Sequence, residues 1–318
     1  MNVSILGFGE YGKALTSVFL DNTENKVRVW NKFESDFLNV GEEYLRCSFT
    51  TDLGYAIKDA HLVVIAIPVK FLDELMIELK NVYNGEDIVI ASKGIDEENY
   101  LFAVEIVKKY LGEIPLGVLS GGTFATDMRN KKVMGITLGS DVSRIRNRIR
   151  SFFECDYVKV QYVSDVIGVS VCGAIKNVMA IGFGMLDGAK FPPSSKFLFL
   201  TEAIYEIRDL IKFLGGDEKT VMTYAGIDDI MMTCTSVESR NYRLGFMIGN
   251  DASNEEILEY KNNTTIEGLG TCLAIYKKSI DINYELPYVN VIYNILYKDG
   301  CISDLIKILE KKSLNLNG

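Results

Sequence analysis

Lys176 lies at the middle of a long apolar stretch, residues 164–188, that is predicted to form one helix. Apolar side chains occupy nearly every side of that helix, so it should be buried. Burial disfavours the charged form of a lysine and moves its pKa down toward neutrality. An amine in that range both gives and takes a proton, as general acid–base catalysis requires. The alternative is a lysine that extends along the helix edge to reach solvent.

A second chemical signal stands at the amino terminus, where Gly7, Gly9 and Gly12 form a GxGxxG pattern. An apolar run at residues 3–6 precedes it, a helical pattern follows it, and residues 27–30 supply another strand. That is the context in which the pattern indicates a dinucleotide-binding fold. Gly7 permits the tight turn, Gly9 lets backbone approach the pyrophosphate, and Gly12 lets helix and strand pack closely.

The segment after the second strand bears on the choice of dinucleotide. NAD-specific sites usually carry an acidic residue there, which bonds the ribose hydroxyls. This chain reads Trp30-Asn31-Lys32-Phe33, and no carboxylate precedes Glu34. Lys32 can pair with a 2′-phosphate, so the sequence favours NADP over NAD. A solvated loop lysine is the alternative.

Alternating strands and helices are predicted to position these groups. Further runs with strand character lie at residues 62–67, 87–91, 116–119, 133–138 and 157–163. Helical patterns at 70–80 and 100–110 separate several of them, and Asp141 is expected to cap another helix with a solvated arginine face. The alternation predicts an α/β domain of Rossmann type with a mostly parallel, doubly wound sheet.

Polar residues follow two of these strands at their carboxyl ends, where parallel sheets bind ligands. Lys93 follows the strand at 87–91, and the small, hydroxyl-bearing segment 120–125 follows the next. Plain turns are the alternative for its glycines. His61, the single histidine, precedes a strand at the opposite edge, so lysines are the better candidates for proton transfer.

Helical periodicity dominates from residue 164 onward. The chain is therefore divided into a dinucleotide-binding domain, residues 1–163, and an all-α substrate-binding and catalytic domain, residues 164–318. Further helices are expected at 198–214, 218–224, 265–278 and 287–297, with starts at Ser253 and Ser303.

The helical part contains one stretch dense in polar chemistry. Asp229 can bond the Lys176 amine and orient it, and Arg240 stands between Ser239 and Asn241. A guanidinium binds phosphate bidentately, so this cluster is suited to a phosphate-binding site. Surface-loop and cap roles are the alternatives for each residue.

The bulk properties exclude several partners. The net charge of −9 and the pI near 4.9 argue against nucleic acid or an anionic membrane surface. Six cysteines without metal spacing predict reduced thiols in a cytoplasmic protein and no metal site. Lys176 and Asn177 interrupt the longest apolar stretch, so we expect a core helix and no membrane insertion.

Eight motifs occur in order along the chain, at residues 7–12, 91–94, 120–125, 172–178, 225–229, 233–235, 239–241 and 266–268. Together they closely resemble NAD(P)-dependent glycerol-3-phosphate dehydrogenase of the bacterial type. The resemblance implies interconversion of dihydroxyacetone phosphate and sn-glycerol 3-phosphate by hydride transfer with NAD(P)H. It further implies a supply of glycerol 3-phosphate for phospholipid synthesis.

The resemblance also implies roles for individual residues. The catalytic group would be Lys176, the proton acceptor in alcohol oxidation, with Lys93 and Asp229. The dinucleotide would contact Gly7, Gly9, Glu10, Tyr11, Gly12, Lys32, Lys93, Ala125, Arg240, Thr265 and Glu267. The substrate would contact Lys93, Gly121, Thr123, Lys176, Asp229, Thr233, Ser239, Arg240 and Asn241.

Four positions depart from the family's pattern. Gly122 stands where proline is usual, which makes its loop less rigid. Glu10 replaces a small polar residue, so its carboxylate should turn away from the pyrophosphate. Lys32 replaces an arginine and lacks the forked geometry, and Glu202 stands where arginine is common.

Two other functions stay open. A β-hydroxyacid dehydrogenase shares the two-domain organisation and a lysine–asparagine pair. It needs a carboxylate-binding site, whereas the cluster at residues 239–241 is better suited to phosphate. A non-catalytic NADP(H)-binding sensor would have little reason to bury Lys176. A small-molecule substrate is the expected partner, and a homodimer is expected because helical second domains often pair.

Overall fold

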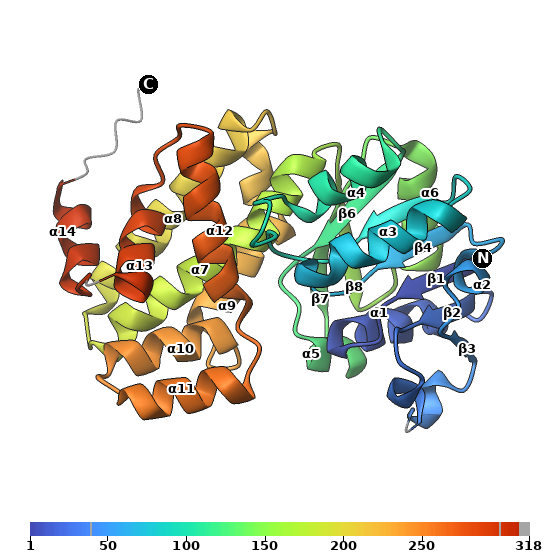
Figure 1. Ribbon diagram of the computed structural model, residues 1–318, viewed down its shortest axis with the longest axis horizontal. Helices are drawn as coiled ribbons and strands as arrows, with labels where there is room; N and C mark the ends of the chain where they lie inside the picture. Colours follow the sequence, from blue (N-terminus) through green and yellow to red (C-terminus); the bar gives the residue numbers. More distant parts are fainter. Residues whose placement is uncertain (39, 299, 312–318) are drawn as a thin grey trace.

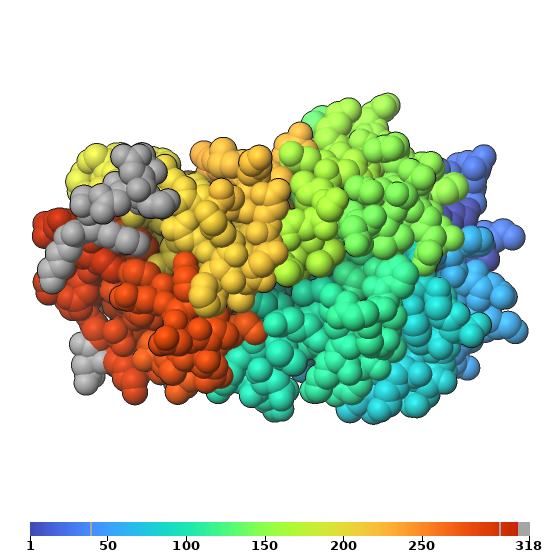
Figure 2. All heavy atoms as spheres, turned by 90° about the horizontal axis from the view of Figure 1, so that it is seen from above, coloured from blue at the N-terminus to red at the C-terminus, as the bar shows by residue number. Residues whose placement is uncertain are grey.

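The computed structural model describes residues 1–38, 40–298 and 300–311. A sheet-containing half, coloured blue to green, and a helical half, coloured yellow to red, lie side by side along the long axis of the molecule (Figure 1). The space-filling view shows the two halves in direct contact (Figure 2).

Eight strands form one sheet in the order β3-β2-β1-β4-β5-β6-β7-β8. Their bounds are β1 Asn2–Leu6, β2 Lys26–Trp30, β3 Cys47–Thr50, β4 Leu62–Ile65, β5 Asp87–Ile90, β6 Leu116–Ser120, β7 Met134–Gly139 and β8 Val158–Val163. Every neighbouring pair is parallel except β6 with β7. The predicted mostly parallel sheet is therefore confirmed. The strand order reverses between β1 and β4, where such sheets bind ligands beyond the carboxyl ends.

Helices cover both faces of the sheet. They are α1 Glu10–Asp21, α2 Leu53–Ile57, α3 Leu72–Val82, α4 Ala103–Leu111, α5 Ala125–Arg129 and α6 Ser143–Phe152. Alternate residues of β4 join different apolar clusters: Leu62 and Val64 pack with α1 and α6, whereas Val63 and Ile65 pack with α2, α3 and α4. This alternation explains why the strand reads as a continuous apolar run.

The helical half surrounds one central helix. The α-helices are α7 Val166–Gly188, α8 Pro193–Phe213, α9 Asp229–Thr235, α10 Arg240–Gly249, α11 Asn254–Asn263, α12 Glu267–Asp281, α13 Pro287–Tyr297 and α14 Ser303–Lys311. The α7 helix packs against α8, α9, α10, α12 and α13, and also against β6 and β7. It therefore touches every element that contributes to the candidate site from this half.

Glycines let α7 and α10 approach closely. A Cβ at Gly184 would lie 2.2 Å from the carbonyl oxygen of Tyr242, and one at Gly245 would lie 2.0 Å from that of Ile181. Each helix thus presents a glycine to the backbone of the other. This contact fixes α10 against the C-terminal half of α7.

Within the described residues, α7 is the one helix long and apolar enough to cross a membrane, by length and composition. Of its apolar window, 83% is buried inside the protein, as in the core helix of a soluble protein. This agrees with the interpretation of the stretch as a core element.

Local details correct several expectations. The edge strand β3 is missed because CSFT lacks an apolar run. Asp141 does not cap α6, whose N-cap residue is Val142 without a side-chain bond. The segment Glu218–Met222 is a 3-10 helix rather than an α-helix. Ser253 does form the expected capping box with Glu256.

The chain passes from β8 to α7 through Ser164 and Asp165. Asp165 caps α7 by accepting a bond of 2.9 Å from the amide of Gly168. One apolar cluster nevertheless runs from Leu6 to Leu305 across both halves. The division into domains at residues 163 and 164 therefore stays a prediction.

Candidate active site

Lys176, Asp229 and Thr233 form a buried polar cluster between α7 and α9. The side chain of Lys176 is 8% exposed and that of Asp229 is 0% exposed. The Lys176 amine donates to the Asp229 carboxylate, and it donates to Thr233 Oγ1 at 3.1 Å. Asp229 and Thr233 are four residues apart on α9 and so share one face. The predicted contact between Asp229 and Lys176 is present.

Lys93 reaches the same carboxylate from the sheet half. Its Nζ lies 3.0 Å from Asp229 Oδ2 and donates to the carbonyl oxygen of Gly121 at 3.1 Å. One buried carboxylate is therefore shared by two ammonium groups. The contact joins the loops after β5 and β6 to α9.

The shared carboxylate separates the two lysines electrostatically. Burial lowers the pKa of Lys176 to about 8, against the attraction of Asp229 and with the repulsion of Lys93. For Lys93 burial acts in the same direction, but the charge of Asp229 and its hydrogen bond prevail and raise the pKa. Lys93 thus stays cationic, while Lys176 is able to release a proton near neutral pH.

Two cavities of about 390 Å³ each run along the carboxyl edge of the sheet. The inner cavity lies between the halves and is lined by residues that include Gly9, Lys93, Thr123, Ala125, Arg240 and Glu267. The outer cavity continues past Pro68 and is lined by residues that include Gly7, Trp30, Lys32, Asp36, Glu74 and Glu78. Gly9, Ala66, Ile67 and Pro68 border both, so the two form one extended cleft.

The glycine turn lies where these cavities meet. Gly7 has a φ of 113°, and a Cβ at Gly12 would lie 2.1 Å from the Gly7 carbonyl oxygen. Both positions therefore require glycine. A Cβ at Gly9 would meet no atom within 4 Å, so its backbone is open toward the cleft. The turn fits a dinucleotide pyrophosphate at the start of α1.

Unpaired buried hydroxyls point to a polar ligand. Among the described residues, Tyr11 Oη, Ser120 Oγ and Thr123 Oγ1 are buried without a hydrogen-bond partner. Buried polar groups are normally paired, so such a group calls for an explanation. Tyr11 and Thr123 border the inner cavity, where a bound polar molecule can satisfy them.

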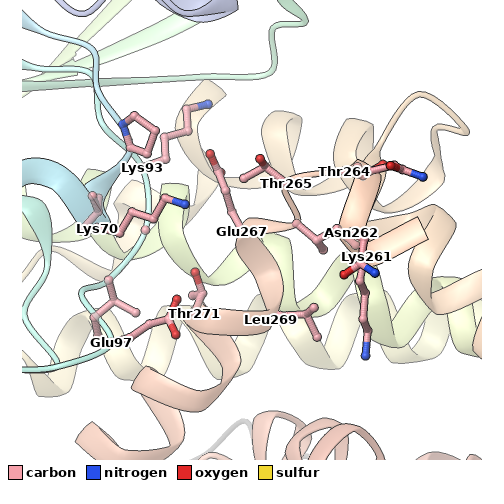
Figure 3. A pocket seen from close by; sticks show the side chains of 16 residues that line it. Lys70, Lys93, Glu97, Lys261, Asn262, Thr264, Thr265, Glu267, Leu269 and Thr271 are labelled. Carbon is pink, nitrogen blue, oxygen red and sulfur yellow. The ribbon is translucent and has the colours of Figure 1, made fainter. Parts of the chain in front are cut away.

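A third cavity of about 430 Å³, the side cavity, shares Lys93, Thr265 and Glu267 with the inner one. Lys93 and Lys70 lie on its sheet side, whereas Thr265 and Glu267 lie on its helical side (Figure 3). Lys70 is not among the predicted site residues, although it follows Pro68 beyond the carboxyl end of β4. Position at that edge was the signal that could have found it.

Several predicted substrate residues serve the local structure. Ser239 caps α10 by accepting from the Tyr242 amide at 3.2 Å. Asn241 donates to Asn177 Oδ1 at 3.0 Å and accepts from the Gly268 amide at 2.9 Å. These two side chains do not border the cavities, and neither do Lys176, Asp229 or Thr233. Arg240 is exposed and borders the inner cavity.

The charged departures from the family pattern have partners. Glu10 pairs with Arg129 at 2.7 Å and Lys13 at 3.3 Å, and the bond from Arg129 lowers its pKa. The two cations therefore neutralise the carboxylate of Glu10 beside the position of the pyrophosphate. Glu202 is buried and accepts from Tyr288 Oη at 3.2 Å, so it belongs to the packing of α8 against α13.

Gly122 faces Asp228. A Cβ at Gly122 would lie 2.5 Å from Asp228 Oδ2. Burial and Asp229 raise the pKa of the Asp228 carboxyl, and a bond from the Gly122 amide opposes them. The glycine therefore makes room for a carboxylate next to the Lys176 cluster.

The fold and the site define a class of protein. A Rossmann-type half carries an open glycine turn, and a helical half carries a buried lysine–aspartate pair beside the same cleft. This is the arrangement of a nicotinamide-dinucleotide-dependent oxidoreductase. Among the described residues, no group of three or more His, Cys, Asp or Glu side chains is placed to hold a metal ion.

Comparison with known proteins identifies the family. Residues 2–145 match the model of the NAD-dependent glycerol-3-phosphate dehydrogenase N-terminus, and residues 165–307 match that of its C-terminus. The chain therefore belongs to the NAD-dependent glycerol-3-phosphate dehydrogenase family. The resemblance drawn from the eight motifs is confirmed.

Individual relatives match over nearly the whole length. A glycerol-3-phosphate dehydrogenase [NAD(P)+] of Ligilactobacillus salivarius is 31% identical, with 98% of this chain and 97% of that protein covered. One of Staphylococcus haemolyticus is 28% identical, with coverage of 98% and 99%. The crystal structure of glycerol-3-phosphate dehydrogenase from Coxiella burnetii has 26% identity and a TM-score of 0.88, over 98% of this chain and 99% of that one.

Proposed function

We propose that this chain interconverts dihydroxyacetone phosphate and sn-glycerol 3-phosphate with NAD(P)H. The observation that carries the proposal is the Lys93–Asp229–Lys176 cluster beside the cleft of the glycine turn. Membership of the family supports it, because the relatives bear that activity in their names. The bound dinucleotide would donate or accept the hydride.

Lys176 is assigned the proton transfer. During reduction its ammonium gives a proton to the oxygen on C2 of the substrate, and during oxidation its neutral amine takes that proton back. The pKa of about 8 suits both directions. Asp229 and Thr233 hold the amine in place, and the small exposed part of Lys176 is where the substrate would reach it.

Lys93 is assigned the electrostatic role. Its raised pKa keeps it charged, and it borders the inner cavity directly. A fixed cation there stabilises the negative charge that develops on the substrate oxygen. Its bond to the Gly121 carbonyl also fixes the loop that carries Thr123.

Arg240 is assigned the binding of the substrate's phosphate group. It opens α10, is exposed, and borders the inner cavity together with Thr123. Ser239 and Asn241 position it through the cap of α10 and the bond to Asn177. The dinucleotide would extend from Ala125, Thr265 and Glu267 past the glycine turn to Lys32.

We further propose a division of labour between two domains, a metabolic role and a dimer contact. The division at residues 163 and 164 separates dinucleotide binding from substrate binding and catalysis. Glycerol 3-phosphate made in the cytoplasm would supply phospholipid synthesis. The helical half would carry a homodimer contact, since Phe197, Met231 and Phe246 expose apolar surface there.

The decisive experiment follows NAD(P)H absorbance with dihydroxyacetone phosphate and, separately, with β-hydroxyacids and their keto acids. The wild type should turn over the phosphate substrate, and Lys176→Met should lose activity by at least about a hundredfold while dinucleotide binding persists. Lys278→Met is the matched control, because Lys278 is also a buried, ion-paired lysine of the helical half.

Other outcomes separate the alternatives. Turnover of hydroxyacids alone would favour a β-hydroxyacid dehydrogenase. Dinucleotide binding without turnover of any substrate would favour the sensor. Full activity in a normally folded Lys176→Met variant would reject the assigned role of the lysine.

A further inference from the structure

The outer cavity is acidic. Its lining includes Lys32 and three carboxylates, Asp36, Glu74 and Glu78. It lies at the end of β2, where the dinucleotide fold meets the adenosine ribose. A 2′-phosphate brought to this place would therefore meet more negative than positive charge.

Lys32 is already engaged by one of these carboxylates. Its Nζ lies 2.5 Å from Glu74 Oε1, and the two side chains are 53% and 55% exposed. Glu74 belongs to the first turn of α3, where the helix dipole favours a negative charge. Binding a phosphate through Lys32 would require the lysine to leave this partner or would bring two anions together.

Asp36 is held at the same end of the cleft. Asn31 accepts from the Phe8 amide in the glycine turn at 3.2 Å, and its Nδ2 donates to the Asp36 carboxylate. Asn31 thus ties the turn to an acidic group. A carboxylate in this region accepts hydrogen bonds from ribose hydroxyls and repels a phosphate.

We infer that this chain selects NAD(H) over NADP(H), with Glu74 as the residue that excludes the 2′-phosphate. Asp36 is the acceptor for the ribose hydroxyls, and Glu78 adds to the repulsion. This inference rests on the proposed function and specifies its cofactor. It reverses the preference for NADP drawn from Lys32, because Glu74 comes from 42 positions further along the chain.

The single tryptophan, Trp30, borders the outer cavity and reports binding without any reaction. Quenching of its fluorescence is titrated with NAD⁺ and with NADP⁺ at low ionic strength. NAD⁺ should bind at least about tenfold more tightly. Added salt should narrow the difference, because it screens exposed charges.

A double variant and a control test whether Glu74 and Glu78 exclude the 2′-phosphate. Glu74→Gln with Glu78→Gln should tighten NADP⁺ binding by about tenfold while NAD⁺ binding changes less than about twofold. Glu218→Gln is the matched control, since it breaks another surface lysine–glutamate pair, Lys212–Glu218, in the helical half. It should leave the ratio of the two affinities unchanged.

Equal or tighter binding of NADP⁺ by the wild type would overturn the inference. An unchanged ratio in the double variant would overturn the role of Glu74. Failure of the proposed function looks different: neither cofactor would support turnover of dihydroxyacetone phosphate, whatever the ratio of their affinities.

Discussion

Lys93 and Lys176 bond different oxygens of a single carboxylate, that of Asp229. One lysine comes from the loop after β5 and the other from the middle of α7, so the two halves of the molecule meet at this carboxylate. With both lysines charged the cluster carries one excess positive charge. Release of a proton from Lys176 leaves the whole cluster with no net charge. Because burying net charge is unfavourable, burial favours this release.

The pH dependence of both reaction directions follows from this arrangement. Oxidation needs the neutral amine of Lys176, so its rate should rise with pH and level off above about 8. Reduction needs the ammonium, so its rate should fall as the pH passes the same value. Lys93→Met should move the midpoint upward, because the charge of Lys93 lowers the pKa of Lys176. Profiles of kcat against pH measure this, and an unmoved midpoint would contradict the electrostatic coupling.

Thr233 should act as a positioning residue. Its hydroxyl accepts from Lys176 at 3.1 Å and donates to Asp229 Oδ1 at 3.2 Å. Thr233→Val keeps the shape but removes both bonds, so kcat should fall about tenfold with KM nearly unchanged. The control is Thr235→Val on the same helix, whose exposed hydroxyl donates to the Met231 carbonyl oxygen. A rise in KM without loss of kcat would argue for a substrate contact instead.

The fold was largely predictable because its strands are buried on both faces. Continuous apolar runs such as that of β4 stand out against polar loops, and the glycine turn fixes the type of sheet. The strand β3 was not predicted because it is a short edge strand of mixed composition, which needs no apolar run. Its position is set by pairing with β2 rather than by its own composition.

The site was predictable only in part. The burial of Lys176 could be expected from the helix around it, the polar stretch suggested Asp229 as its partner, and the carboxyl end of a strand placed Lys93 at the ligand-binding edge. No local pattern indicates that Glu74 neutralises Lys32, because the two meet only when the first turn of α3 comes to lie beside the segment that follows β2. Ser239, which is predicted to contact the substrate, also accepts from the Tyr242 amide as the cap of α10, and its contact with the substrate stays a prediction.

The close approach of α7 and α10 should limit stability. Gly184→Ala places a Cβ 2.2 Å from the Tyr242 carbonyl oxygen, which is backbone and cannot swing away. The helices must separate, so the free energy of unfolding should fall by about 1–3 kcal/mol. Urea denaturation followed by circular dichroism measures this loss. An unchanged midpoint would mean that the helices do not pack as described.

Gly122 and Asp228 should behave as a coupled pair. Proline at 122 lacks the amide that bonds Asp228, and its ring would occupy the space of that carboxylate. Gly122→Pro should therefore displace the loop of Gly121 and Thr123 and raise the KM for dihydroxyacetone phosphate by about tenfold.

Asp228→Gly in the same chain removes the obstacle, so the double variant should recover most of the lost affinity. The double-mutant cycle, measured by KM, then gives a coupling between the two sites, whereas additive effects would show that Gly122 and Asp228 act independently. Recovery would also explain how this chain dispenses with the proline that is usual at position 122: the carboxylate of Asp228 fills the place of the ring and holds the loop through the Gly122 amide.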